Sequence, residues 1–330
     1  MLLHSCKYLL KCTEYIIVNS LMNGSRAYSG FYKFLEYCFT RCAVSFIRIL
    51  PLRVAYFLGE KIGCICWLLM SGRRATVKEN LKIVQSWIDQ LEQSSIRPTI
   101  TNGKIIDTAT KEVFCRSAAN LLSSFSFAAL SFKKRHPLLE FENLEVLKDA
   151  VDRRHGVVLL MAHMGPWEVV SSFAEHFIHN NIKAPYGAIY RTLNNDYMEK
   201  WYRSQRQRQG IQLFKRKAGL LEVFKFIKSG GILALLADQH VNTGENVEFF
   251  GEPALTSPLV GVLAKRAKAS VVSLTLKYDR SCKLKAGFRL VDFEKASTRK
   301  DFAKLTNQEL EKVLTSDTTS GFWFHKRFKM

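Results

Sequence analysis

The chain has 330 residues, of which 47% are hydrophobic and 23 are phenylalanine, so it is long and apolar enough to bury a large core. This composition excludes an intrinsically disordered protein. The formal net charge of +20 favours an anionic partner, which can be nucleic acid, an anionic membrane surface or an acidic protein. Charge alone does not choose among the three.

The N-terminal part of the chain follows helical patterns. Residues 1–30 are mixed and remain unassigned, whereas residues 31–93 predict helices. A loop insertion is expected at residues 94–107, which contain a proline and an Asn-Gly pair, and another helix at residues 110–131.

A membrane-associating segment is predicted within these helices. No uninterrupted run of about 18 apolar residues is present, so the sequence contains no clean membrane-spanning helix. The closest stretch, Phe46 to Met70, is interrupted by Pro51 and by charged residues, and the basic pair Arg73-Arg74 follows it. This pattern is typical of a short anchor or an interfacial helix, and an ordinary buried helix is the alternative. No small-residue cleavage site follows the N-terminal apolar stretch, so we expect no cleavable signal peptide.

The cysteines do not predict a disulfide framework or a metal site. Seven of the eight lie between Cys6 and Cys115, with spacings that match no zinc signature, and Cys64 and Cys66 are too close to chelate a metal. We expect reduced, small apolar side chains in a cytosolic or membrane-facing region.

After Pro137 the pattern changes to alternating apolar strands and helices, which predicts an α/β domain with a mixed or largely parallel sheet. Strands are expected at residues 157–161, 184–190, 211–214, 232–237, 271–276 and 288–293. Helices are expected near residues 170–178, 195–209, 220–228 and 257–268, with Asn194 or Asn195 as the cap of the second.

The most distinctive stretch is residues 157–168, where an apolar strand ends at His163 and a Gly165-Pro166 break leads to Glu168 at the start of a helix. Residues five apart on a continuous helix point away from each other, whereas a sharp turn between strand and helix can bring them together. His163 and Glu168 therefore predict a general base and its orienting carboxylate. The free N–H groups of the helix start are suited to a developing oxyanion.

The spacing of this pair is weak on its own, because 8 histidines and 29 acidic residues in 330 yield about 0.7 such matches by chance. A second match, His240 with Glu245, lies in a polar loop without a helix start and is discounted. A structural role for His163 is the alternative. Metal binding would require a third ligand, and we expect His176 and His179 to lie on the solvated side of the next helix, not on a metal.

Other chemistries lack their motifs. The chain has no Gly-x-Ser-x-Gly elbow and no cysteine at a comparable strand end, so no enzyme nucleophile is predicted. It has neither a Walker loop nor Gly-x-Gly-x-x-Gly, so no nucleotide cofactor is expected, and no recognition motif for nucleic acid is present.

With these residues in view, the chain from about Arg41 to Lys329 resembles the lipid A biosynthesis acyltransferases of the secondary, or late, lauroyl/myristoyl type. Ala162-His163-Met-Gly-Pro-Trp167-Glu168 is similar to that family's His-x4-acid motif. The other similar motifs are Arg73-Arg74 with Glu79-Asn80-Leu81, Tyr190-Arg191 with Asn194-Asn195, the helix with Arg203, Arg206 and Arg208, Ala237-Asp238-Gln239, Phe249-Phe250-Gly251-Glu-Pro253, and Trp323-Phe-His325-Lys-Arg327. Two departures are His240, where the family usually has another acid, and the absence of a proline before the last motif.

The resemblance implies an α/β fold with a glycerol-3-phosphate acyltransferase-like mixed sheet and flanking helices, preceded by an N-terminal helical membrane-associating region. It divides the chain into an unassigned extension at residues 1–40, a membrane-anchoring or interfacial region at residues 41–75 and a catalytic domain at residues 76–330.

The implied reaction moves a fatty acyl chain from acyl carrier protein to a hydroxyl of a lipid A precursor of the Kdo-lipid IVA type. It would take place at the cytoplasmic face of the inner membrane, on an anionic surface, without metal, cofactor or nucleic acid. His163 would be the base and Glu168 its partner, and no acyl-enzyme would form. Arg206 would bind phosphate or stabilise the oxyanion, Asp238 would organise the basic site, and Arg191 is a further phosphate candidate.

The segment from Lys200 to Lys217 has seven basic residues and no acidic one, which suits an acidic carrier protein or lipid phosphates. Two alternatives stay open at this point. One is an acyltransferase for another glycolipid, such as a phosphatidylinositol mannoside, and the other is a basic, non-enzymatic protein that binds membrane or nucleic acid.

Overall fold

The computed structural model describes residues 30–92, 106–207, 210–216, 219–279 and 281–328. Residues 1–29 and most of the predicted 94–107 insertion lie outside the described residues.

A seven-stranded sheet with the order β1-β9-β8-β2-β5-β3-β4 forms the centre of the molecule. Its strands are β1 (Leu139–Glu142), β2 (Val157–Met161), β3 (Tyr186–Tyr190), β4 (Ile211–Lys215), β5 (Ile232–Leu236), β8 (Ser270–Tyr278) and β9 (Leu284–Val291). Five of them, β8, β2, β5, β3 and β4, run parallel, and β9 pairs antiparallel with β8. The predicted α/β class with a mixed, largely parallel sheet is confirmed, and each of the six predicted strands overlaps an observed one.

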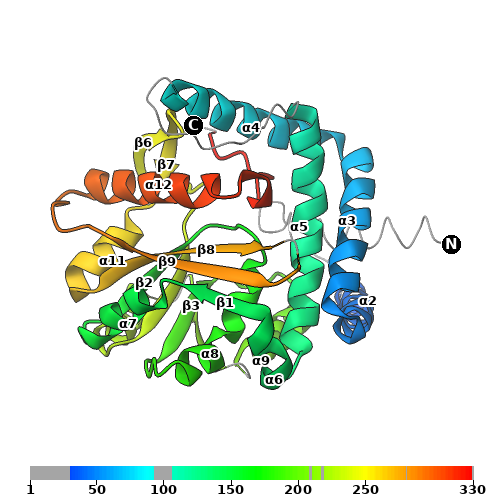
Figure 1. Ribbon diagram of the computed structural model, residues 1–330, viewed down its shortest axis with the longest axis horizontal. Helices are drawn as coiled ribbons and strands as arrows, with labels where there is room; N and C mark the ends of the chain where they lie inside the picture. The colour runs from blue at the N-terminus through cyan, green and yellow to red at the C-terminus, as the bar shows by residue number, and fades with distance from the viewer. Residues whose placement is uncertain (1–29, 93–105, 208–209, 217–218, 280, 329–330) are drawn as a thin grey trace.

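The central strand β2 is apolar throughout because the sheet is covered on both faces. All five of its residues are buried. Val158 and Leu160 join one core, with α10 (Leu220–Lys228), α11 (Leu259–Ala267) and α12 (Arg299–Thr315). Val157, Leu159 and Met161 join the other, with α7 (Leu144–Asp152) and α8 (Phe173–His179). Figure 1 shows α12 on one side of β8 and β9, and α7 and α8 on the other.

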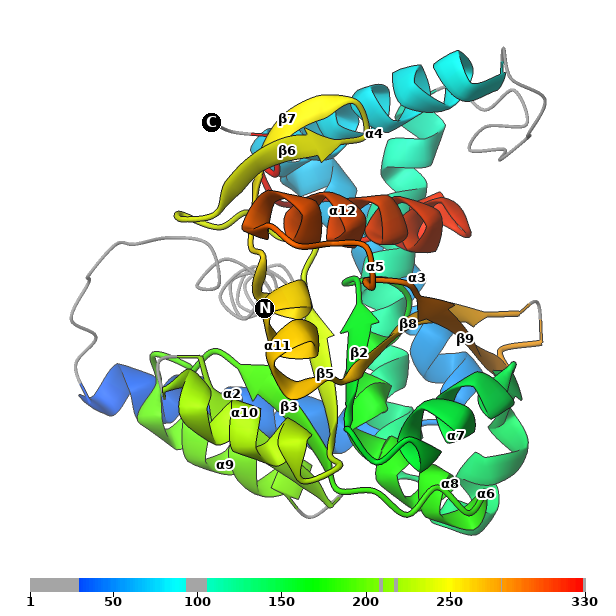
Figure 2. The ribbon, with the colours of Figure 1, turned by 90° about the vertical axis from the view of Figure 1, so that its left-hand side faces the viewer.

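The predicted helices are present: α10 has the predicted limits, residues 220–228, and the limits of the others are shifted. The helix predicted at residues 110–131 is α5 (Ile106–Ala129), and the one predicted at residues 195–209 is α9 (Asp196–Gln207). In place of the helix predicted at residues 170–178, the structure has a 3-10 turn, η2 (Trp167–Ser172), followed by α8. Asn195 caps α9, since its side-chain oxygen accepts hydrogen bonds from the backbone N–H groups of Tyr197 and Met198. The sequence patterns did not predict α7, α12, the short α6 (Phe132–Arg135), β1 or the hairpin of β6 (Glu245–Phe249) and β7 (Glu252–Thr256), which lies against α12 (Figure 2).

Three helices precede α5: α2 (Gly30–Ile49), α3 (Leu52–Leu69) and α4 (Ser71–Glu92). Pro51 separates α2 from α3. Helix α3 packs closely along α5, because a Cβ atom at Gly59 would lie 2.4 Å from the Cα atom of Ala119, and one at Gly63 would lie 2.3 Å from the Phe114 carbonyl oxygen. One face of α3 is therefore buried, whereas Val54, Phe57, Ile65, Leu68 and Leu69 are exposed large hydrophobic residues of the same helix.

Among the described helices, none taken singly has the length and hydropathy to cross a membrane; α3 and α4 meet that test only together, as a pair bent by 101°. The predicted domain limits at residues 40 and 75 fall inside α2 and α4. The division into extension, anchor and catalytic domain stays a prediction.

His176 departs from its predicted position. We expected it on the solvated side of its helix, but it is completely buried, because α6 and β1 cover that side of α8. Its ring lies among those of Phe132, Phe141 and Phe173, and the ring of His136 stacks on it at 5.7 Å. No group of three His, Cys, Asp or Glu residues within the described ranges could hold a metal ion. The cysteines in those ranges form no disulfide; they are Cys38, Cys42, Cys64, Cys66, Cys115 and Cys282.

Candidate active site

The sheet brings His163 and Asp238 together. Met161 of β2 is in register with Leu236 of the neighbouring parallel strand β5, and each candidate residue lies two positions beyond the end of its strand. The Nδ1 atom of His163 lies 2.7 Å from Oδ1 of Asp238. The pair therefore occupies the carboxyl edge of a parallel sheet, which is where open α/β sheets bind their ligands.

The loop that carries His163 requires glycine at position 165. Gly165 has a φ of +58°, and a Cβ atom there would lie 2.2 Å from the carbonyl oxygen of Leu276, so only glycine fits. The C-terminal segment holds the loop from the other side: the Phe322 N–H donates to the His163 carbonyl at 2.8 Å, and the Gly165 N–H donates to the Ser320 carbonyl at 3.0 Å. The predicted Gly165-Pro166 turn is present, and it fixes the position of His163.

The Asp238 carboxylate determines which nitrogen of His163 is basic. Burial would raise the pKa of Asp238, but the attraction and hydrogen bonds of His163 outweigh it and hold that pKa below the usual value. An ionised carboxylate only accepts hydrogen bonds, so Nδ1 carries the ring proton and Nε2 keeps its lone pair. The side-chain nitrogen of Gln239 lies 3.2 Å from Nε2, so an amide N–H occupies that lone pair. The arrangement can accept a proton at Nε2 and stabilise the resulting imidazolium through Asp238.

Glu168 makes other contacts than the predicted ones. Its Oε2 atom accepts a hydrogen bond from an Arg206 guanidinium nitrogen at 2.6 Å and another from the Tyr202 hydroxyl, and none of its hydrogen bonds goes to His163. The prediction that Glu168 orients the His163 ring through a hydrogen bond is therefore wrong. The physical reason is that the Trp167 ring packs against the His163 ring, with centroids 5.5 Å apart, while Glu168 faces α9.

Glu168 and Arg206 form a mostly enclosed ion pair, with side chains 23% and 19% exposed. Burial would raise the pKa of Glu168, but the positive charge of Arg206 and the hydrogen bond from Tyr202 hold it below the usual value. Burial would lower the pKa of Arg206, but Glu168 and Tyr202 raise it above the usual value. The guanidinium also lies over the Tyr202 ring, 4.1 Å from its centroid. Both groups are charged at neutral pH.

The remaining predicted site residue, Arg191, is exposed and follows directly after the end of β3. It stands at the same edge of the sheet as His163, since β3 runs parallel to β5 and β2. Its role as a phosphate ligand stays a prediction, as do the catalytic roles of the other predicted residues.

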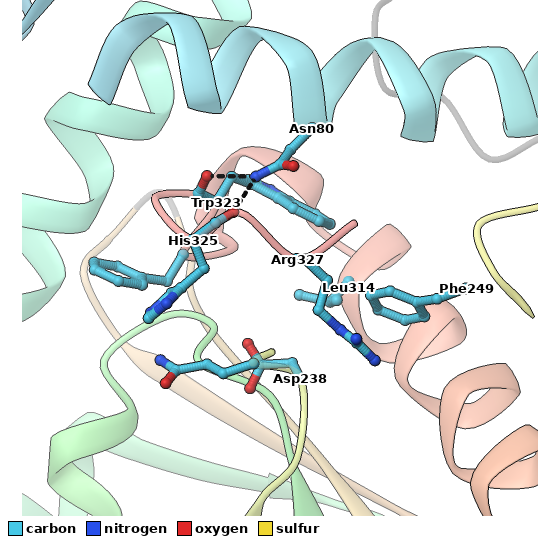
Figure 3. Close-up of a pocket in the computed structure, with 9 residues that line it drawn as sticks. Asn80, Asp238, Phe249, Leu314, Trp323, His325 and Arg327 are labelled. Carbon is cyan, nitrogen blue, oxygen red and sulfur yellow. Dashed lines mark hydrogen bonds between the residues drawn. The ribbon is translucent and has the colours of Figure 1, made fainter. Parts of the chain in front are cut away.

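A pocket of about 300 Å³ is lined by Asp238, the hydrogen-bond partner of His163, and Figure 3 shows the residues around it. Asp238 and Gln239 contribute to it from the end of β5, and Trp323, His325 and Arg327 from the C-terminal segment. Gln239, Tyr202 and His325 also belong to the site but were not predicted from the sequence, although Gln239 and His325 lie within family motifs. Burial of a histidine close to His163 is decided by tertiary packing, and no local pattern signals it.

A second cavity, of about 560 Å³, is apolar and lies between α3 and α5. It is lined by Ile62, Cys66, Met70, Arg73, Phe114, Ser117, Ala118, Leu121, Leu122 and Phe324. Phe324 joins it to the site, because its ring packs on that of Phe322 with centroids 4.8 Å apart, and the Phe322 ring lies 6.3 Å from that of His163.

Comparison with known proteins identifies the family of the chain. No match was found among curated proteins. The model of the bacterial lipid A biosynthesis acyltransferase family matches residues 31–330, which include every site residue described above. The members of this family are transferases of acyl groups, which excludes a purely structural or binding protein. The chain therefore belongs to the family of bacterial lipid A biosynthesis acyltransferases.

Proposed function

We propose that this acyltransferase moves a fatty acyl group from acyl carrier protein to a hydroxyl of a lipid A precursor of the Kdo-lipid IVA type. His163 is the general base and Asp238 is the carboxylate that orients it. The observation that carries this mechanism is the 2.7 Å contact between His163 Nδ1 and Asp238 Oδ1 at the ends of adjacent parallel strands. The family supports acyl transfer and a lipid A-type acceptor.

The reaction needs no enzyme nucleophile. The acceptor hydroxyl displaces the Gln239 amide from Nε2 of His163 and gives its proton to that nitrogen as its oxygen attacks the thioester carbonyl carbon. Asp238 stabilises the imidazolium through the Nδ1–H bond. The tetrahedral intermediate then collapses, the carbon–sulfur bond breaks, and the departing thiolate takes the proton back from Nε2. The products are an ester and a free thiol, and His163 returns to its starting state.

The Glu168–Arg206 pair takes a different role from the base. The Arg206 nitrogens other than Nη2 make no hydrogen bond to the residues that the structure describes, so they can donate to an anionic or carbonyl oxygen of the substrate. Glu168 holds the guanidinium in place and keeps it charged. Arg191, exposed at the same edge, is positioned to contact a phosphate of the acceptor.

The apolar cavity between α3 and α5 is the proposed site for an acyl chain. Most of its lining is hydrophobic, as suits a fatty acyl chain, and Arg73 and Ser117 are its polar members. Phe322 and Phe324 connect it to His163, so a chain in the cavity can present its carbonyl carbon near the base.

Acyl carrier protein is the proposed donor because a basic surface lies beside the site. Lys200, Arg203, Lys215 and Arg216 of α9 and the end of β4 are exposed, and no acidic residue occurs from Lys200 to Lys217. A positive surface of this kind accelerates association with an acidic partner.

The membrane surface is the proposed place of the reaction. Helices α2 and α3 expose several large hydrophobic side chains, among them Phe31, Phe34, Phe46 and Phe57, at 67%, 45%, 57% and 57% exposure. Single exposed apolar residues are ordinary, but a cluster on two consecutive helices is typical of an interfacial surface. We assign these helices to the cytoplasmic face of the inner membrane, ahead of a catalytic domain with a glycerol-3-phosphate acyltransferase-like sheet.

The direct test is an acyl transfer assay with acyl carrier protein thioesters and a tetra-acylated lipid A precursor. We expect wild-type protein to form the ester and His163→Ala to lose at least about 10²-fold in turnover, the lower scale for removal of a general base. His155→Ala changes an exposed histidine elsewhere and is the matched control, expected to keep full activity. Unchanged turnover in a folded His163→Ala variant would contradict the proposed mechanism.

A further inference from the structure

The C-terminal segment that crosses the site is held by side chains of α4. The Asn80 amide donates to the carbonyl oxygens of Trp323 and His325, at 2.8 and 2.7 Å (Figure 3). Arg73 donates to the carbonyl between them, that of Phe324, at 3.2 Å. Three consecutive carbonyls are therefore fixed, and the backbone of His325 has a defined position relative to the sheet.

The His325 side chain extends from this segment toward the strand end that carries Asp238 (Figure 3). It is only 5% exposed, and its ring centroid lies 6.5 Å from that of His163. Its Nε2 atom is buried and has no hydrogen-bond partner among the described residues. A buried, unpartnered polar nitrogen is costly to a folded protein, so its presence in a reaction pocket indicates a partner that arrives with the substrate.

The surroundings keep His325 uncharged. Burial lowers its pKa, and the nearby His163 and Arg73 lower it further, to about 3. A neutral imidazole has one N–H donor and one lone pair. At neutral pH this ring can donate a hydrogen bond to a developing negative charge without gaining or losing a proton.

We propose that the His325 imidazole is an oxyanion donor, which gives its N–H to the acyl carbonyl oxygen while the acceptor hydroxyl attacks. This inference rests on the proposed acyl transfer with His163 as base. As the new carbon–oxygen bond forms, the carbonyl π pair moves onto the oxygen, and His325 stabilises that charge. When the carbon–sulfur bond breaks, the carbonyl reforms and His325 is unchanged.

The spacing of the two rings fits this division of roles. A base acts over a hydrogen bond of about 2.6–3.2 Å, and an oxyanion donor acts over about 2.7–3.1 Å. With centroids 6.5 Å apart, the two rings are close enough for one tetrahedral carbon to place one oxygen against each of them once the Gln239 amide is displaced. Asn80 and Arg73 act through the backbone of His325 and are positioning residues.

The test compares His325→Phe, which keeps the bulk of the ring but removes the donor, with His325→Gln, which keeps an N–H donor. In the acyl transfer assay we expect His325→Phe to lose about 10²–10³-fold in kcat, with KM within about threefold of wild type. His325→Gln should recover at least about tenfold of that loss. Lys326→Ala alters the exposed neighbour on the same segment and should match wild type.

A folded His325→Phe variant with kcat within about threefold of wild type overturns the inference, and so does a His325→Gln variant as inactive as His325→Phe. Thermal unfolding of each variant checks the fold. If His325→Phe does not fold, His325→Ala is assayed with added imidazole: a rise in turnover of at least about tenfold supports a donor role, and no rise overturns it.

Different results would contradict the proposed function and this inference. Absence of acyl transfer by wild type, or full activity of His163→Ala, removes the proposed function and this inference with it, whereas an active His325→Phe removes only the inference.

Discussion

His163 and Asp238 lie two residues past the ends of adjacent parallel strands, with Nδ1 and Oδ1 2.7 Å apart. Because β2 and β5 are paired in register along their whole length, the separation of these two side chains is fixed by the sheet and not by a flexible loop. The relationship makes Asp238, not Glu168, the residue that selects the tautomer of His163.

Replacement of Asp238 by asparagine tests this assignment. Asp238→Asn keeps the volume of the side chain but removes the charge that stabilises the imidazolium, and its amide can reverse the tautomer of His163. We expect kcat to fall by at least about 10²-fold. Asp292→Asn, beyond the end of the antiparallel strand β9 and exposed, is the matched control and should retain activity. A folded Asp238→Asn variant with near-normal kcat would contradict the assignment.

The Glu168–Arg206 pair predicts strong coupling in stability. Arg206→Ala leaves a mostly enclosed carboxylate without its cation, which we expect to cost on the order of 3 kcal/mol in the free energy of unfolding. Because the pKa of Glu168 is lowered in the folded protein, this stabilisation is fully present above the usual pKa of a glutamate and is lost as the pH falls through the folded value.

Adding Glu168→Gln to Arg206→Ala removes the unpaired charge, so the double variant should be more stable than Arg206→Ala alone. Urea unfolding at pH 7 of the wild type, both single variants and the double variant measures the coupling. If the loss in unfolding free energy of the double variant equals the sum of the losses of the two single variants, Glu168 and Arg206 are not coupled.

Buried His176 predicts acid sensitivity. Burial, followed by the charges of Arg135, His136 and His179, lowers its pKa to about 4. In the unfolded chain this histidine has an ordinary pKa of about 6.5. Between pH 6.5 and pH 4 it is therefore protonated in the unfolded chain but neutral in the folded protein. The free energy of unfolding is unaffected above about pH 6.5 and falls as the pH drops toward 4. The expected loss is about 2 kcal/mol at pH 5.

His176→Phe removes this loss in an aromatic environment. We therefore expect the free energy of unfolding of the variant, relative to that of wild type, to be about 2 kcal/mol more favourable to the variant at pH 5 than at pH 8. Any change in packing is independent of pH and cancels in that comparison. Phe173→Leu alters the same cluster without a titratable group, and its difference from wild type should stay constant. A constant difference for His176→Phe would refute the prediction.

The apolar cavity predicts a change in acyl selectivity. Ala118→Leu reduces the space between α3 and α5, and Leu121→Ala enlarges it. Each buried methylene contributes about 0.8 kcal/mol, so two methylenes change the preference by roughly tenfold. We expect competition assays with donors that differ by two methylenes to shift toward the shorter chain for Ala118→Leu and toward the longer for Leu121→Ala. Thr108→Leu, exposed on the same helix, should keep the wild-type preference. Identical selectivity in all three would remove the cavity from acyl binding.

The exposed faces of α2 and α3 predict binding to lipid. A Phe46→Glu/Phe57→Glu variant places two carboxylates where the structure exposes two aromatic rings, so we expect at least about tenfold weaker flotation with anionic phospholipid vesicles. Leu290→Glu changes an exposed apolar residue on β9 and is the control. Equal flotation of the double variant and the control would assign membrane binding to another part of the chain.

The sequence by itself predicted most of the strands of the large sheet and the candidate base His163. Uninterrupted apolar runs at residues 157–161 and 232–236 predict strands buried on both faces, and the Gly165-Pro166 break predicts the turn after His163, because these signals are local. Short elements with weak patterns, such as β1 and the β6–β7 hairpin, were not predicted from the sequence.

Only the tertiary structure decided which partner each side chain has. Glu168 lies five residues from His163 and yet pairs with Arg206 and Tyr202, whereas Asp238 lies 75 residues away and bonds to the imidazole. His325 reaches the same pocket from the far end of the chain, on carbonyls held by Asn80. The physical reason is that strand register and the packing of distant segments set side-chain distances, and neither is encoded in the spacing of residues along the chain.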